Sequence, residues 1–213
     1  MLDRGIVIVD YGLGNLASVR NMLRKAGYAS DISADHDAIR RASRLILPGV
    51  GAFDEGMRSL AGRGLIEVLN ETVIANRTPF LGICLGMQLM TRRSDEGSLP
   101  GLGWVAGDTE AFRFTASSAD LRVPHMGWNT VTSRGGSFLA SAVPADARFY
   151  FVHSYHVRCD DPGDVALTAP YGTDVVAGVA RGNIAGTQFH PEKSHRFGLQ
   201  LLGAFAEWSG AHA

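Results

Sequence analysis

The sequence has too few cysteines for a fold stabilised by disulfides. Only two occur among its 213 residues, Cys84 and Cys159, and they lie far apart in unlike surroundings. Small secreted proteins that depend on disulfides use several cysteines at short spacings, so the sequence does not fit that class. We expect two free thiols in a reducing compartment.

Long apolar runs and an excess of charge of either sign are also lacking. The N-terminus offers Arg4 and then only the apolar run 6–9, much shorter than a signal-peptide core or a membrane span. Twenty Lys and Arg face twenty-one Asp and Glu, so the formal net charge is -1 and no overall field attracts nucleic acid or an anionic membrane. We therefore expect a cytoplasmic protein without a nucleic-acid or membrane partner.

The composition and rhythm of the chain indicate an α/β fold. Hydrophobic residues make up 46% of the sequence, and no repeat or linker divides it, so we expect one domain over residues 1–213. Continuous apolar runs alternate with helix-like segments, which predicts an open, mainly parallel twisted sheet flanked by helices. The predicted strands are 6–9, 45–47 and 80–83, and the predicted helices are 16–26 and 64–76.

After about Leu99 the apolar runs become shorter and turn residues more frequent, which predicts an antiparallel extension. The strand candidates there are Trp104–Val105, Phe112–Phe114, Val123, Val131 and Phe149–Val152, loops are expected at Ser94–Gly103 and Thr115–Asp120, and a closing helix is expected at Phe197–Trp208.

The strand ending in Gly82-Ile83-Cys84-Leu85-Gly86 has the layout of a nucleophile elbow with cysteine in place of serine. Small residues two positions before and after the nucleophile allow other backbone to approach it. The N–H of Leu85, at the start of the following helix, is free to stabilise an oxyanion, and the helix dipole favours the thiolate at Cys84. An arbitrary cysteine is more often only a small buried hydrophobe. The paired glycines make Cys84 the candidate nucleophile, and Cys159, near a turn, keeps the structural interpretation.

A cysteine nucleophile needs a histidine base, which in turn needs an orienting acceptor. Among seven histidines, His190 ends a plausible strand, 184–189, and is followed by Pro191 and Glu192. Residues i and i+2 of an extended segment project to the same side, so Glu192 is expected to reach the imidazole.

Two other chemistries compete with this reading. His153 with His156, or His190 with His195, resemble partial metal sites, but neither has the second cluster that zinc requires, and we expect no metal and no cofactor. Gly12 to Ala17 matches the G-x-G-x-x-A dinucleotide fingerprint and has Asp31 at a suitable distance. Asp10 and Tyr11, inserted between strand and glycines, displace that turn from its usual place.

The blocks Gly82 to Gln88 and Gln188 to Ser194 together resemble the class I glutamine amidotransferases, whose elbow reads G-x-C-x-G-x-Q and whose base lies in F-H-P-E. Further blocks are similar to the branch of that family serving histidine biosynthesis, the glutaminase subunits of imidazole glycerol phosphate synthases. These blocks are Asp10 to Leu16, Pro48 to Phe53, Val123 to Asn129 and Tyr150 to Tyr155, and the resemblance runs from residue 6 to about residue 203.

The resemblance implies a glutaminase with a triad of Cys84, His190 and Glu192. It implies that ammonia is released from L-glutamine and passed to a (β/α)₈-barrel cyclase subunit, in a heterodimer that makes imidazole glycerol phosphate and AICAR. The remaining residues that it implies are Val50, Leu85 and Gly51 for the oxyanion hole, Gln88, Ser154 and Tyr155 for glutamine, and Asn15, Ser18, Trp128, Tyr150 and Lys193 for the partner.

Other readings remain. Some bacteria carry second copies of this subunit that supply ammonia for amidination of surface sugars, and the sequence is compatible with that role. A non-enzymatic assembly subunit and a dinucleotide-binding protein are disfavoured by the intact Cys84, His190 and Glu192. Glutaminases serving anthranilate, guanylate or carbamoyl phosphate synthesis generally lack the block 124–129.

Overall fold

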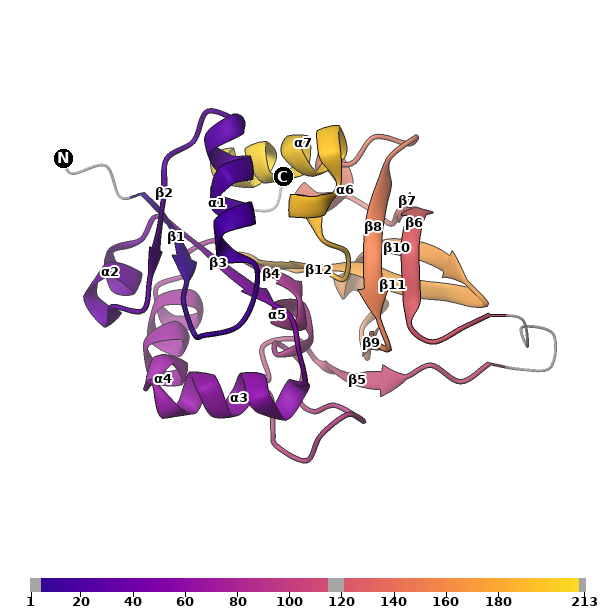
Figure 1. Ribbon diagram of the computed structural model, residues 1–213, viewed down its shortest axis with the longest axis horizontal. Helices are drawn as coiled ribbons and strands as arrows, with labels where there is room; N and C mark the ends of the chain where they lie inside the picture. The colour runs from indigo at the N-terminus through magenta and orange to yellow at the C-terminus, as the bar shows by residue number, and fades with distance from the viewer. Residues whose placement is uncertain (1–4, 115–120, 211–213) are drawn as a thin grey trace.

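The computed structural model describes residues 5–114 and 121–210, and an eight-stranded sheet forms their centre (Figure 1). Its strands lie in the order β2-β1-β3-β4-β12-β11-β10-β7. The first five pair in parallel and the rest are antiparallel, which confirms a mainly parallel sheet with an antiparallel extension. The bounds are β1 Ile6–Val9, β2 Ser30–Ser33, β3 Arg44–Gly49, β4 Phe80–Cys84, β7 Thr132–Ser133, β10 Val165–Tyr171, β11 Thr173–Arg181 and β12 Ile184–Thr187.

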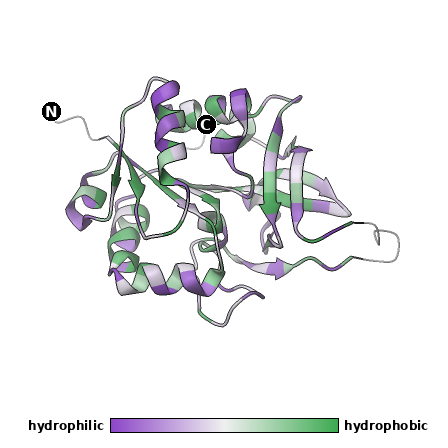
Figure 2. Ribbon diagram, in the orientation of Figure 1, coloured by the Kyte–Doolittle hydropathy of each residue, from purple (hydrophilic) through white to green (hydrophobic). Residues whose placement is uncertain are grey.

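Helices cover both faces of this sheet (Figure 1). Successive side chains of a strand point to opposite faces, so Ile6 and Ile8 of β1 pack in one core cluster and Val7 and Val9 in the other. The first cluster includes residues of α1 (Leu16–Lys25), α6 (Phe138–Ala142) and α7 (His195–Glu207), and the second includes residues of α2 (His36–Arg41), α3 (Phe53–Gly62), α4 (Leu65–Leu69) and α5 (Leu85–Gln88). In Figure 2 the inner parallel strands are accordingly mostly hydrophobic, while the helices carry mixed colours.

Two small antiparallel sheets lie beside the main one. β5 (Gly107–Ala111) pairs with β9 (Tyr155–Cys159), and β6 (His125–Thr130) pairs with β8 (Arg148–His153). The backbone N–H of His190 donates to Tyr150 O at 2.9 Å, which holds β8 against the segment that follows β12.

Several local predictions in the second half were wrong. Trp104–Val105 is not a strand, because Trp104 packs edge-on against Phe80 at 5.0 Å and donates its indole N–H to Asn70 Oδ1 at 2.7 Å. Phe112–Phe114 lies beyond the end of β5, and its two aromatic rings stack on each other at 5.5 Å. Val123 and Val131 flank β6 rather than forming strands, whereas Phe149–Val152 lies within β8 as expected.

The helical predictions were also incomplete. The expected helix 64–76 is α4 followed by a π-helix, Asn70–Ala75, and the closing helix starts two residues earlier than expected, at His195. Helices α2 and α3 were not anticipated, and the loop expected at Thr115–Asp120 lies outside the described residues. None of the described helices is both long enough and apolar enough to cross a bilayer.

Candidate active site

Cys84 occupies a strained turn between β4 and the short helix α5. Its φ is 54°, a left-handed conformation that is uncommon for a residue other than glycine and typical of functional turns. The two glycines of the motif are required by close packing. A Cβ added at Gly86 would lie 1.8 Å from Leu47 O, and one at Gly82 would lie 2.6 Å from Gly86 O. The elbow predicted from the sequence is therefore present.

His190 and Glu192 form a buried pair. His190 Nδ1 lies 2.8 Å from Glu192 Oε1, and the two side chains are 1% and 2% exposed. The prediction that they meet was right, but the reason given for it was wrong. Pro191–Lys193 is a turn of 3₁₀-helix rather than an extended segment, and the turn folds the carboxylate back onto the ring.

The remaining nitrogen of His190 is available for chemistry. Its Nε2 is buried and has no hydrogen-bond partner among the described residues. Burial alone lowers the pKa of His190, but the side chains of Cys84 and Glu192 outweigh burial and raise the pKa to about 9. Since Nδ1 is held by the carboxylate, Nε2 is the proton donor and acceptor that this arrangement presents to the thiol.

A cavity of about 310 Å³ joins these groups to the other predicted site residues. Cys84 and His190 both line it. The structure places all the sequence candidates for an oxyanion hole and for substrate contacts on its wall, namely Val50, Gly51, Leu85, Gln88, Ser154 and Tyr155. The cavity thus brings these predicted residues together from four separate parts of the chain.

Sequence reasoning missed two polar residues at this site. Glu96 lines the cavity and accepts a hydrogen bond from the Phe53 N–H at 2.8 Å, which fixes one carboxylate oxygen. Gln188 is fully buried, and its Nε2 lies 3.8 Å from Cys84 Sγ. Gln188 stands two residues before His190, so it was visible in the motif, whereas Glu96 lies in a loop with no local signal.

The residues expected to face a partner fall into two groups. Trp128 and Tyr150 are cross-strand neighbours of β6 and β8, and Lys193 places its ammonium 5.7 Å from the Tyr150 ring centroid. His195, which the sequence reasoning had weighed only as a metal ligand, stacks on Trp128 at 5.2 Å with an interplanar angle of 2°. Asn15 and Ser18 are joined at the start of α1, where the Asn15 side chain accepts from the Ser18 N–H.

The competing chemistries receive little support from the geometry. His153 bonds to His125 and to Tyr155 O, and the described residues contain no group of three or more His, Cys, Asp or Glu suited to a metal ion. A Cβ at Gly14 would lie 2.9 Å from Pro48 O, so the glycine loop packs against β3 and offers no open cradle for a phosphate. Burial, reinforced by nearby aspartates, raises the pKa of Cys159 to about 12, which leaves this thiol neutral and unreactive.

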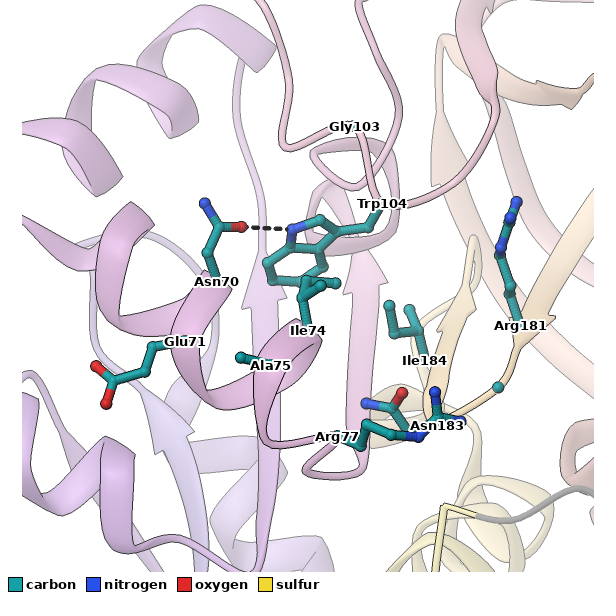
Figure 3. A pocket seen from close by; sticks show the side chains of 11 residues that line it. Asn70, Glu71, Ile74, Ala75, Arg77, Gly103, Trp104, Arg181, Asn183 and Ile184 are labelled. Carbon is teal, nitrogen blue, oxygen red and sulfur yellow. Dashed lines mark hydrogen bonds between the residues drawn. The ribbon is translucent and has the colours of Figure 1, made fainter.

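A larger cavity, of about 840 Å³, lies elsewhere, between the π-helix and the β11–β12 turn (Figure 3). Its polar side chains serve the fold. Trp104 bonds to Asn70, and Asn183 Nδ2 donates to Val73 O and Thr78 O, which closes the end of the π-helix. No cysteine and no histidine line the larger cavity, so the smaller cavity at Cys84 is the candidate active site.

Comparison with known sequences identifies the relatives of this chain. The profile described as Glutamine amidotransferase class-I matches residues 7–205. Imidazole glycerol phosphate synthase subunit HisH 2 of Pseudomonas aeruginosa is 49% identical over 202 residues, which cover 95% of this chain and 98% of that protein. The subunit HisH of Bdellovibrio bacteriovorus is 44% identical over 202 residues, covering 95% of this chain and 99% of the relative.

Solved structures agree on the fold. A crystal structure of a glutamine amidotransferase superposes with a TM-score of 0.69 at 19% identity, covering 93% of this chain and 100% of that one. A putative gmp synthase subunit a protein from Thermoplasma acidophilum gives a TM-score of 0.68 at 19% identity, covering 95% of this chain and 92% of its own. At this level of identity the similarity establishes the fold alone.

Proposed function

The chain belongs to the class I glutamine amidotransferase family, and from that membership we propose that it is the glutaminase subunit of an imidazole glycerol phosphate synthase in histidine biosynthesis. The whole chain acts as one catalytic domain. The observation that carries the chemistry is that Cys84 and His190 line one cavity while Glu192 holds the opposite nitrogen of the imidazole. Relatives named as subunits of that synthase are 49% and 44% identical over nearly their full length, which supports the pathway.

In the first half-reaction the Cys84 thiolate attacks the side-chain amide carbon of L-glutamine. The carbonyl π electrons move to oxygen, forming a tetrahedral oxyanion. As the C–N bond breaks, protonated His190 donates its Nε2 proton to the leaving nitrogen, which departs as ammonia. The products are a glutamyl thioester at Cys84 and a neutral His190, and Glu192 keeps the ring in the required tautomer.

In the second half-reaction neutral His190 takes a proton from water through Nε2, and the resulting hydroxide attacks the thioester carbon. The C–S bond breaks, the new side-chain carboxylic acid loses its proton to water as glutamate leaves, and Cys84 returns as thiolate beside protonated His190. The raised pKa of His190, about 9, keeps its imidazole protonated near neutral pH.

Backbone N–H groups of Leu85 and Val50 stabilise the oxyanion in this proposal. Leu85 opens α5, where the first N–H groups of a helix have no intrahelical acceptor. Val50 precedes Gly51, whose φ of 116° shows that the loop already uses a conformation in which glycine is favoured. A peptide rotation at this loop, driven by a partner, would turn the second donor inward.

Glutamine binding is assigned to other residues that line the cavity. Gln88, Ser154 and Tyr155 line the cavity, and Glu96 adds a negative charge that complements the substrate ammonium group. No cofactor is needed, because each step uses only protein groups and water.

The partner is a cyclase subunit of the (β/α)₈-barrel type. The surface that contacts this partner consists of Trp128, Tyr150, Lys193 and His195. Helix α1 packs beside it and adds Asn15 and Ser18 to the same face. Ammonia is protonated in bulk water near neutral pH and is then no longer a nucleophile. A closed heterodimer interface that conducts it to the acceptor therefore preserves its reactivity.

A second candidate is a paralogous glutaminase that serves another amidotransferase, such as a surface-sugar amidination enzyme. The observation that favours it is the number 2 in the names of several relatives, including those of Pseudomonas aeruginosa and Methanococcus maripaludis. Both candidates share the same chemistry and differ in the acceptor.

The deciding experiment measures glutamate release from L-glutamine by the purified chain, alone and with each candidate synthase partner. The histidine-pathway cyclase with its phosphoribosyl ligand is expected to activate the chain and to form imidazole glycerol phosphate from glutamine. Activation only by the other synthase would establish the paralogous role. Absence of glutaminase activity with every partner would refute the proposed chemistry.

A further inference from the structure

Two buried histidines that the proposed reaction does not use lie side by side where the β6–β8 sheet borders the active-site cavity. His125 and His153 face each other across the two strands, with His125 Nδ1 and His153 Nε2 only 2.9 Å apart. Their side chains are 3% and 5% exposed. Buried imidazoles are costly unless their nitrogens are hydrogen-bonded, so the positions of their protons can be worked out from their partners.

The proton positions of both rings follow from one fixed acceptor. His153 Nδ1 lies 2.8 Å from Tyr155 O, a carbonyl oxygen that can only accept, so Nδ1 carries the hydrogen. Burial lowers the pKa of His153 to about 3, and a neutral ring protonated on Nδ1 has a bare Nε2. That Nε2 must therefore accept from His125 Nδ1. Burial also lowers the pKa of His125, to about 4, so this ring is neutral as well. Because its one hydrogen is on Nδ1, its Nε2 is an acceptor.

Asn129 supplies the donor at the outer end. Its Nδ2 lies 3.2 Å from His125 Nε2 and 2.9 Å from Pro170 O, while its Oδ1 accepts from the Thr130 N–H at 2.9 Å. The amide orientation is thus determined by two backbone groups. Asn129 donates to His125, His125 donates to His153, and His153 donates to Tyr155 O, so the hydrogen bonds all run in one direction.

The inner end of this series of hydrogen bonds reaches the nucleophile. Tyr155 O also accepts from Gln88 Nε2 at 3.1 Å, and that nitrogen lies 3.2 Å from Gln188 Oε1. Gln188 Nε2 is in turn 3.8 Å from Cys84 Sγ. The orientation of the Gln188 amide, and hence the donor offered to the sulfur, depends on Gln88 and on the position of the Tyr155 carbonyl.

The outer end lies on β6, a strand that carries two exposed hydrophobic residues. Side chains of β6 alternate, so His125 and Asn129 point inward, whereas Met126 and Trp128 point outward and are 63% and 42% exposed. We propose that Asn129, His125 and His153 are positioning residues, which couple the outer face of β6 through Tyr155 O, Gln88 and Gln188 to Cys84 during glutamine hydrolysis. This proposal rests on the proposed glutaminase function.

Substitutions at His125 separate hydrogen bonding from packing. The ring of His125 stacks on Phe151 at 4.6 Å and on Tyr171 at 3.9 Å. His125→Phe keeps an aromatic ring in this stack but cannot donate, and it leaves His153 Nε2 unpaired. His125→Asn loses the ring but places an amide N–H near the position of Nδ1, so it can still donate to His153.

The first test measures kcat and KM for glutamine, together with the melting temperature, in the complex with the activating synthase partner. His125→Phe is expected to lower kcat about tenfold, with a smaller change in KM, because one buried hydrogen bond in the chain is lost. His125→Asn is expected to restore most of kcat although it melts at a lower temperature. If His125→Phe has both the higher kcat and the higher melting temperature of the two variants, His125 is a packing residue and the proposal is overturned.

A second readout needs neither glutamine nor a partner. In the isolated chain carrying Cys159→Ser, iodoacetamide alkylates Cys84, and the rate is expected to fall about threefold with His125→Phe and to recover with His125→Asn. An inactive wild-type complex would refute the proposed function, whereas the alkylation rates would still test the coupling through the hydrogen bonds. Equal alkylation rates for wild type and both variants would overturn the inference itself.

Discussion

His190 Nδ1 and Glu192 Oε1 are 2.8 Å apart in a pair that is almost wholly buried. The carboxylate holds the imidazole in one orientation and contributes, with Cys84, to raising the pKa of His190 to about 9. The protonated form needed to release ammonia therefore persists through neutral pH, and the loss of this proton should limit the reaction at alkaline pH.

Glu192→Gln should move the alkaline limb of the glutaminase pH profile to lower pH. The neutral amide no longer raises the pKa of His190, so the proton needed by the leaving group is lost earlier as pH rises. Measuring kcat/KM of the activated complex from about pH 6 to about pH 10 gives the shift. His190→Ala serves as the reference and should lose more activity at every pH. An unmoved alkaline limb would assign it to another group.

Cys84→Ala should abolish glutamine-dependent synthesis while the complex still uses added ammonium salt, because the acceptor chemistry belongs to the partner. Cys159→Ser is the matched control and should leave kcat near the wild-type value, since burial raises the pKa of the Cys159 thiol to about 12. Both substitutions are compared in glutamine-dependent and ammonium-dependent assays. Loss of both activities in Cys84→Ala would contradict the division of labour.

Gly51→Val should reduce the activation of glutaminase by the partner with little effect on assembly. The φ of Gly51 is 116°, which a β-branched residue adopts only with strain, and one oxyanion donor contributes about 10²–10³-fold to kcat. The isolated chain should be slow, and the partner should raise kcat far more than it lowers KM.

Gly135→Val controls for backbone strain alone. Gly135 also has a positive φ, 107°, but a Cβ there meets no atom within 4 Å, and the residue does not line the cavity. If the partner activates Gly51→Val and Gly135→Val equally, or if the isolated wild-type chain is fully active, gating at the Val50–Gly51 loop is ruled out.

Gly86→Ala should lower the free energy of unfolding by about 3 kcal/mol, because its Cβ would meet Leu47 O at 1.8 Å and force the elbow away from β3. Gly136→Ala, where a Cβ meets nothing within 4 Å, should change it by less than about 0.5 kcal/mol. Urea denaturation of both variants measures the difference. Similar stabilities would mean that the elbow can relax without cost.

Trp128→Ala should weaken binding of the cyclase subunit about tenfold or more, because an exposed aromatic stacked on His195 has the character of an interface anchor. Ile74→Ala, another exposed hydrophobic residue beside the larger cavity, should not affect binding. Titration calorimetry with the cyclase gives both constants. Equal affinities would place the interface elsewhere.

The sequence by itself determined the parts of this protein that depend on local order. The apolar runs of β1 and β4 are continuous because both faces are covered, and the glycines around Cys84 are dictated by contacts within the elbow and with the neighbouring strand β3. His190 and Glu192 are two residues apart, so their pairing was visible even though the turn that joins them was misread.

Only the tertiary structure decided which distant residues meet. Glu96 enters the cavity from a loop, and His125 meets His153 through antiparallel pairing, neither of which has a local signature. Trp104 has strand propensity but becomes part of a buried loop because its indole finds an acceptor in Asn70. Such contacts form when burial of apolar surface and satisfaction of buried polar groups outweigh local preference, and both are set by segments far away along the chain.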